Sequence, residues 1–171
     1  APGTIAAEEI DVMSLDRHGE VITPCGALNL LPEFSELGEA GGMKVLDLMD
    51  AARTCDDDRL IEMARQDSPA LSFGVLSPED AFAIPGPEQD VNRYEMLTRL
   101  LATTPGVTGE DSGLWRWPAE PTTDAQWADL VEREIVTQNE VDAMREAGAG
   151  YVGYRVVVGE DGTWHAFIAG D

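Results

Sequence analysis

Apolar residues recur along this chain at the spacing of helices in its middle and of paired strands at its C-terminal end. Steps of three and four residues predict helices within 44–66, 91–103 and 124–147. The acidic cluster 56–58 divides the first of these ranges, because an aspartate there can cap a second helix. The middle of the chain is therefore expected to be mainly helical.

Two helix starts in the last of these ranges share the same capping chemistry. Thr123 with Gln126, and Thr137 with Glu140, have the spacing of a capping box. In this motif the threonine oxygen and the side chain three residues later each accept a hydrogen bond from a backbone N–H. Gly148 follows the second start at a distance that suits the end of a helix.

The last segment has the pattern of a β-hairpin over residues 151–169. Asp161-Gly162 lies between two apolar runs and suits the centre of a type I′ turn, which needs positive φ at both positions. Both faces of the hairpin are largely apolar, so it is expected to be covered on both sides. The predicted register sets Val158 opposite His165, Val156 opposite Phe167, and Arg155 opposite Ile168.

These patterns predict an α+β fold in which an antiparallel sheet, ending in the hairpin, is packed by several helices. A length of 171 residues suits one domain with an extension. Residues 1–42 contain short strand-like runs and then a Gly- and Glu-rich stretch that is typical of a loop. We therefore predict an N-terminal extension over 1–42 and a main domain over 43–171.

The charge balance limits the classes of partner. The chain has 33 acidic and 11 basic residues, a net charge of -22, and Lys44 is its one lysine. Such a surface repels phosphate backbones and anionic lipids, so nucleic acid is not an expected partner. No apolar run approaches the ~18 residues of a spanning helix.

The first residues favour an exported protein. The chain begins without Met or an apolar signal segment, as a mature chain does after signal-peptide cleavage, and a trimmed chain would begin in the same way. The prediction is a secreted or cell-envelope location, which allows a lipid anchor upstream of residue 1.

The cysteines fit the same prediction. Cys25 and Cys55 are the two cysteines, and in an exported protein an isolated pair usually forms a disulfide. Closing a loop of about 30 residues would stabilise the fold by on the order of 3–4 kcal/mol. The alternative is two buried free thiols in a cytosolic protein. With no Cys-x-x-Cys pair and no adjacent histidine, neither a metal ion nor a cofactor is expected.

The C-terminal third holds four tryptophans, which could line a ligand cleft or could be ordinary core residues. Arg116 and Arg155 are the basic groups that could meet an anionic ligand in such a cleft, or they could pair with neighbouring carboxylates. The candidate ligand-binding residues are Trp115, Arg116, Trp117, Arg155 and Trp164.

His165 is the weak catalytic candidate, as the one histidine of the main domain. A histidine on a strand is more often packed than catalytic, and a general base also needs an orienting carboxylate. The aspartates of cluster 56–58 are adjacent at a helix start and cannot all face one ion, so capping explains them better than calcium.

Several C-terminal motifs carry a resemblance. "LWRWP", "WADL" and "GYRVVV-GEDGTWHAFIAGD" resemble uncharacterised exported bacterial proteins that end in a Gly-Tyr-Arg, Asp-Gly-x-Trp, Ala-Gly-Asp hairpin. The order of elements over 43–171 also resembles the cone-shaped SnoaL-like α+β fold. This resemblance implies an exported location and a fold, and no catalytic residue.

The function predicted first is a non-enzymatic exported or envelope-anchored binding domain whose Trp-lined cavity takes a small molecule, a peptide or a protein partner. The alternative is a SnoaL-like enzyme that uses His165 or a carboxylate for proton transfer. A purely structural surface module is the third hypothesis.

Overall fold

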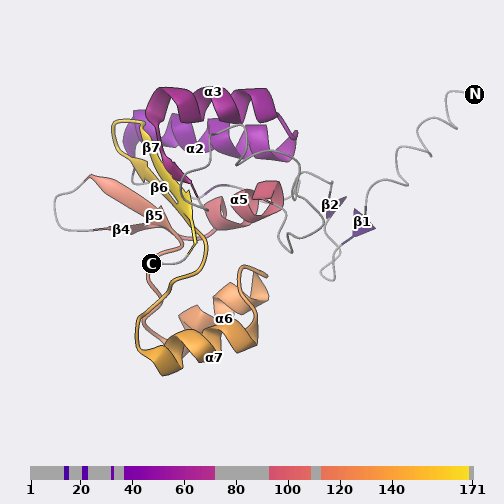
Figure 1. The fold of residues 1–171 in the computed structure, drawn as a ribbon, viewed down its shortest axis with the longest axis vertical. Helices are drawn as coiled ribbons and strands as arrows, with labels where there is room; N and C mark the ends of the chain where they lie inside the picture. Colours follow the sequence, from indigo (N-terminus) through magenta and orange to yellow (C-terminus); the bar gives the residue numbers. More distant parts are fainter. Residues whose placement is uncertain are drawn as a thin grey trace, which may run out of the picture.

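The α+β prediction is confirmed by the computed structural model, in which helices pack on a five-stranded sheet (Figure 1). The structure describes residues 14–15, 21–22, 32, 37–71, 93–108 and 113–169. The helices are α2 (Gly38–Arg53), α3 (Asp57–Asp67), α5 (Arg93–Leu101), α6 (Asp124–Glu132) and α7 (Gln138–Ala147). The strands of the sheet are β3 (Ala70–Leu71), β4 (Gly106–Val107), β5 (Leu114–Trp117), β6 (Arg155–Gly159) and β7 (Trp164–Ile168).

The strand order in the sheet is β3-β7-β6-β5-β4. Pairing is antiparallel from β4 through β7, as predicted, while β3 adds to β7 in parallel at the edge. Helices α2, α3 and α5 contact β6 and β7, and the α6–α7 pair lies apart from them, beyond the other end of the sheet (Figure 1). A separate antiparallel pair joins β1 (Ser14–Leu15) to β2 (Val21–Ile22).

Helix α2 begins earlier than the sequence suggested. The Gly-rich stretch before residue 43 was expected to be a loop, yet residues 38–42 are helical. A Cβ on Gly41 would lie 3.0 Å from the carbonyl oxygen of Gly159 and 3.0 Å from the side chain of Leu37. Glycine thus allows this end of α2 to pack closely on β6. The predicted boundary between the N-terminal extension and the main domain, at 42/43, lies inside α2.

The capping predictions are confirmed. Asp56 accepts a hydrogen bond from the backbone N–H of Arg59 at 3.0 Å and so caps α3. Both α6 and α7 begin with complete capping boxes, formed by the pairs Thr123–Gln126 and Thr137–Glu140. Helix α7 ends at Gly148, whose φ of 71° is the left-handed value predicted for this position.

The C-terminal hairpin is present, but its turn is not type I′. Gly162 has a φ of 87°, whereas Asp161 keeps a negative φ. The Gly162 N–H donates to the Gly159 carbonyl at 3.0 Å, and the Gly159 N–H donates to the Thr163 carbonyl at 2.9 Å. This is a three-residue loop with one left-handed glycine, so a single positive φ is enough.

The longer loop changes the register near the turn. Val156–Phe167 and Arg155–Ile168 pair as predicted, but Val158 pairs with Trp164 because a bulge interrupts the ladder after Val157. The predicted Val158–His165 pair is therefore wrong. His165 is left as the extra residue and is exposed, while Trp164 joins the buried face of the sheet and has 0% exposure.

Of the two cysteines in the predicted disulfide, only Cys55 lies in the described part of the chain. Cys55 follows α2, has a φ of 54° and packs against the core. Cys25 lies outside the described residues, so the Cys25–Cys55 pairing stays a prediction.

A thiol titration tests this pairing. We expect no reactive thiol in denatured, unreduced protein and two after reduction. A Cys55→Ser variant, as the matched control, should show one thiol without reduction. Two thiols before reduction would contradict both the disulfide and export into an oxidising compartment.

Candidate functional site

The tryptophans belong mainly to the hydrophobic core. Trp117 and Trp164 have 0% exposure, and the Trp164 indole Nε1 donates to the Ala166 carbonyl at 3.1 Å. Trp127 is also buried, at 7% exposure. Trp115 is half-exposed, and its Nε1 donates to Glu160 Oε1 at 3.1 Å. Trp117 and Trp164 therefore have no free surface on which a ligand could pack.

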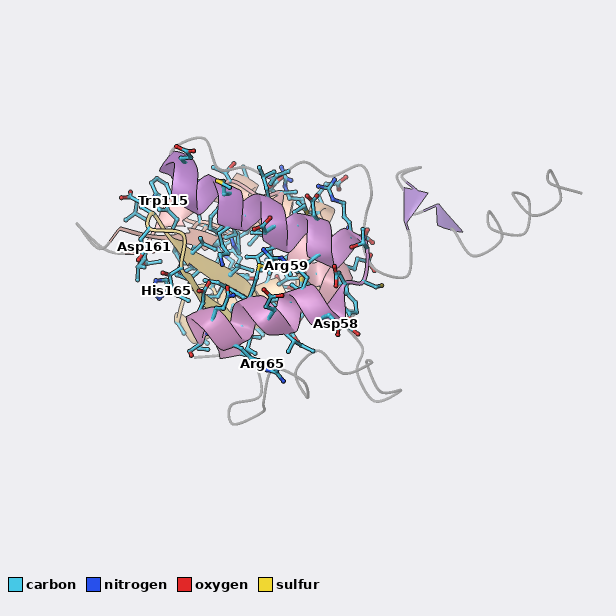
Figure 2. The ribbon with its side chains drawn as sticks, turned by 90° about the horizontal axis from the view of Figure 1, so that it is seen from above. Asp58, Arg59, Arg65, Trp115, Asp161 and His165 are labelled. Carbon is cyan, nitrogen blue, oxygen red and sulfur yellow. The ribbon has the colours of Figure 1, made fainter. Side chains whose placement is uncertain are left out.

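His165 lies at the exposed end of the hairpin, together with Asp161 (Figure 2). A Cβ on Gly159 would lie 2.7 Å from Asp161 Oδ1 and 3.2 Å from His165 Nε2, so both side chains flank this glycine. The hydrogen bond from the Thr163 N–H lowers the pKa of Asp161, and the nearby His165 acts in the same direction. This pair is open to water, which is a poor setting for general-base catalysis.

Two surface hollows occur among the described residues, and neither includes a predicted site residue. One, of about 320 Å³, lies between Thr103, Pro118 and Leu130. The other, of about 490 Å³, follows the outer side of α3 between Asp58 and Arg65 (Figure 2).

Several acids in or beside these hollows are engaged in structural contacts. Asp129, in the first hollow, accepts a hydrogen bond from Arg133 at 2.8 Å. In the aspartate cluster, Asp56 caps α3 and Asp57 accepts a hydrogen bond from the Tyr94 hydroxyl. Within the described ranges, no group of three or more His, Cys, Asp or Glu side chains is placed to hold a metal ion.

The sheet brings Arg116 and Arg155 to one face. Arg116 on β5 pairs with Val157 on β6, and Arg155 lies two residues before Val157 on the same strand. Residues two apart on a strand point to the same side, so the two guanidinium groups share a face as diagonal neighbours. Helices α2, α3 and α5 cover the opposite face, which carries the buried Trp117, Val156 and other core residues.

The face that carries the arginines is half-exposed and otherwise apolar. We call it the arginine face. It consists of Leu114, Arg116, Arg155, Val157, Ala166 and Ile168. All of these residues except Ala166 keep partial solvent exposure. The expectation that both faces of the hairpin are covered therefore holds for the helix-covered face and fails for this one.

Arg116 has spare hydrogen-bonding capacity. Its Nε donates to the Pro118 carbonyl at 3.0 Å, and its guanidinium carbon lies 5.8 Å from the centre of the Tyr151 ring. Its Nη2 is buried and meets no acceptor among the described residues. Burial lowers the pKa of Arg116, the charge of Arg155 lowers it further, and Glu120 opposes both. The guanidinium is thus held in an unfavourable environment for a cation.

The residues beside Arg116 are firmly positioned. The Tyr151 hydroxyl donates to the Tyr154 carbonyl at 2.5 Å, and burial raises the pKa of this tyrosine. The backbone N–H of Tyr151 donates to the Glu120 carboxylate at 3.2 Å. Arg155 is less constrained, since its Nη1 donates to the Gly153 carbonyl at 3.3 Å.

The two arginines also differ from six other described cations, each of which forms an ion pair. Lys44 bridges Asp67 at 2.8 Å, and Arg99 bridges Glu95 at 2.5 Å. The remaining described ion pairs involve Arg53, Arg59, Arg133 and Arg145. Within the described residues, no ion pair includes Arg116 or Arg155, although acids outnumber bases threefold in the sequence.

The structure thus unites two of the predicted ligand-binding residues and separates the others. Arg116 and Arg155 lie together on the open face, Trp115 lies on the opposite face near its edge, and Trp117 and Trp164 are core residues. The sequence predictions missed the apolar neighbours Leu114, Val157 and Ile168. Their alternation with Arg116 and Arg155 along the strands was the available signal.

Comparison with known proteins adds no identification. No protein-family model, curated protein or solved structure matches this chain. No helix in the described part of the chain is long and apolar enough to cross a membrane.

Proposed function

We propose that this chain is a non-catalytic binding domain of an exported or envelope-anchored protein, and that it contacts its ligand through the arginine face. One observation carries the proposal. Arg116 and Arg155 share a half-exposed sheet face without an ion-pair partner among the described residues, in a chain of net charge -22. Leaving charged groups partly buried and unpaired is costly, and an external anionic group would offset that cost.

The proposal keeps the binding role predicted from the sequence, but it places the binding site on the arginine face instead of in a Trp-lined cavity. A cavity lined by tryptophans is not part of it, because Trp117 and Trp164 are fully buried. The exported location remains part of the proposal, and the thiol titration of Cys25 and Cys55 tests it. The SnoaL-like enzyme alternative has less support, since His165 is exposed and neither described hollow includes it.

An NMR screen tests the location of the site. The probes are small carboxylates, alcohols and amines of matched size, added separately to ¹⁵N-labelled protein. We expect at least one class to shift the backbone amide signals of Leu114, Arg116, Val157 and Ile168. The amides of α3, which packs on the opposite face of the sheet, serve as the internal control.

The same screen can overturn the proposal. Shifts that cluster around Asp161 and His165 would favour the enzyme alternative instead. Probes that shift no signal on the arginine face would leave the binding proposal without a site, and the structural-module hypothesis would then be preferred.

A further inference from the structure

We infer that the ligand of the arginine face is an aliphatic monocarboxylate, whose carboxylate contacts Arg116 and Arg155 and whose apolar chain lies on Val157, Ile168 and Leu114. This inference rests on the proposed function and specifies the chemistry of the same site.

The donors available on this face match a carboxylate. A guanidinium group carries five N–H donors in a planar fork and no acceptor. Arg116 Nε donates a hydrogen bond to the Pro118 carbonyl, and Arg155 Nη1 donates one to the Gly153 carbonyl. Arg116 Nη2 is buried without an acceptor, so a ligand from solvent reaches this guanidinium at Nη1. Arg116 Nη1 and the Nε and Nη2 atoms of Arg155 form no hydrogen bond with the described residues. One carboxylate between them has lone pairs for both forks.

Charge selects a singly charged anion. Guanidinium forks fit phosphate as well as carboxylate, so shape does not distinguish the two. The chain as a whole carries a net charge of -22. A doubly charged phosphate monoester is both attracted by the arginines and repelled by the acidic chain about twice as strongly as a carboxylate, but its desolvation cost rises with the square of its charge, about fourfold, so a half-buried face favours the singly charged anion.

The apolar neighbours select a ligand with an aliphatic part. Val157 lies directly opposite Arg116, and Ile168 lies directly opposite Arg155, each on the neighbouring strand. Leu114 continues the face along β5, two residues before Arg116, and all three apolar side chains are partly exposed. Covering this surface would remove apolar area from water, which favours binding of an aliphatic chain.

Octanoate is the probe that tests the inference, with octanol, octylamine, acetate and octyl phosphate as matched comparisons. We expect octanoate to bind at least about tenfold more tightly than each of the others, since it alone combines a single negative charge with the apolar chain. In unmodified protein, octanoate should also shift the Nε–Hε NMR signals of Arg116 and Arg155. This second readout needs no variant and so does not depend on the folding of one.

The variants are Arg116→Gln and Arg155→Gln, with Arg53→Gln as the control. Each of the first two should weaken octanoate binding about tenfold, because a charge-assisted contact is lost, and should leave octanol binding unchanged. The control removes an arginine that pairs with the exposed Asp50 on α2, away from the arginine face, and should change neither.

The outcomes separate this inference from the proposed function. If octanol binds as well as octanoate, or if Arg155→Gln binds octanoate normally, the carboxylate inference is wrong while the binding face stands. If no probe shifts any signal of Leu114, Val157 or Ile168, both proposals fail.

Discussion

Replacing Trp164 with alanine is expected to lower the free energy of unfolding by about 3–5 kcal/mol, as large-to-small changes of buried aromatic residues do. The side chain has 0% exposure and lies opposite Val158 on the helix-covered face. Its Nε1 also donates to the Ala166 carbonyl at 3.1 Å. The change would leave a cavity between the sheet and the helices and one acceptor without its donor. Denaturant unfolding followed by far-UV circular dichroism measures this loss.

Trp115→Ala is the matched control for Trp164→Ala. Trp115 is half-exposed, and its indole hydrogen bond to Glu160 lies at the surface, so we expect a loss of at most about 1.5 kcal/mol. If instead Trp164→Ala kept full stability, Trp164 would not be a core residue. The sequence-based hypothesis of a Trp-lined cavity would then be preferred to the arginine face.

Replacing Arg99 with methionine is expected to cost about 3 kcal/mol of stability, because it removes one partner of a buried ionic network. Arg99 is 8% exposed and lies 2.5 Å from Glu95 Oε1 and 3.4 Å from Glu134 Oε2. It also donates to the Arg133 carbonyl at 3.2 Å and so ties α5 to the segment after α6. Chemical denaturation at neutral pH measures the effect.

Two further variants identify the cause of the loss at Arg99. Arg145→Met removes a cation that is 47% exposed and whose partner, Asp124, is 88% exposed, and should change stability by no more than about 0.5 kcal/mol. Adding Glu95→Gln to Arg99→Met should recover part of the lost stability, because the unpaired carboxylate is then neutral. A double variant no more stable than Arg99→Met would show that lost packing, not charge, is responsible.

Arg99 on the one hand, and Arg116 and Arg155 on the other, are therefore expected to have opposite effects on stability and on ligand binding when they are replaced. Arg99 is paired and buried, so its removal should lower stability and leave ligand binding unchanged. Arg116 and Arg155 are unpaired among the described residues, so Arg155→Gln should change octanoate binding with little loss of stability. Measuring both quantities for all three variants would test the whole assignment.

Much of the fold was predictable because its signals are local. The threonine caps at Thr123 and Thr137 satisfy the backbone donors of their own first turn, so their spacing alone identified two helix starts. Apolar periodicity located the helices, and Gly162 located the turn of the hairpin. The α+β class followed from the order of these elements.

Other features depended on contacts between distant parts of the chain. The sequence of residues 38–42 is typical of a loop, because it is rich in glycine. These residues are helical in the structure, where the close contact of Gly41 with β6 favours glycine in the helix. One additional residue in the hairpin loop moved Trp164 to the buried face and left His165 in water, and no local pattern distinguishes the two registers. The edge strand β3 pairs with β7 from nearly a hundred residues away, as Ala70 with Ala166.

For the proposed site, the sequence was sufficient to name Arg116 and Arg155 as candidate anion-binding groups in an acidic chain. Which of the other candidate residues lie beside them depended on the packing of strands and helices. Pairing of β5 with β6 placed Arg116 and Arg155 on one open face, while helix packing enclosed Trp117 and Trp164. The physical reason is that the types of residue fix charge and hydrogen-bonding capacity locally, whereas exposure and proximity arise only when strands and helices pack.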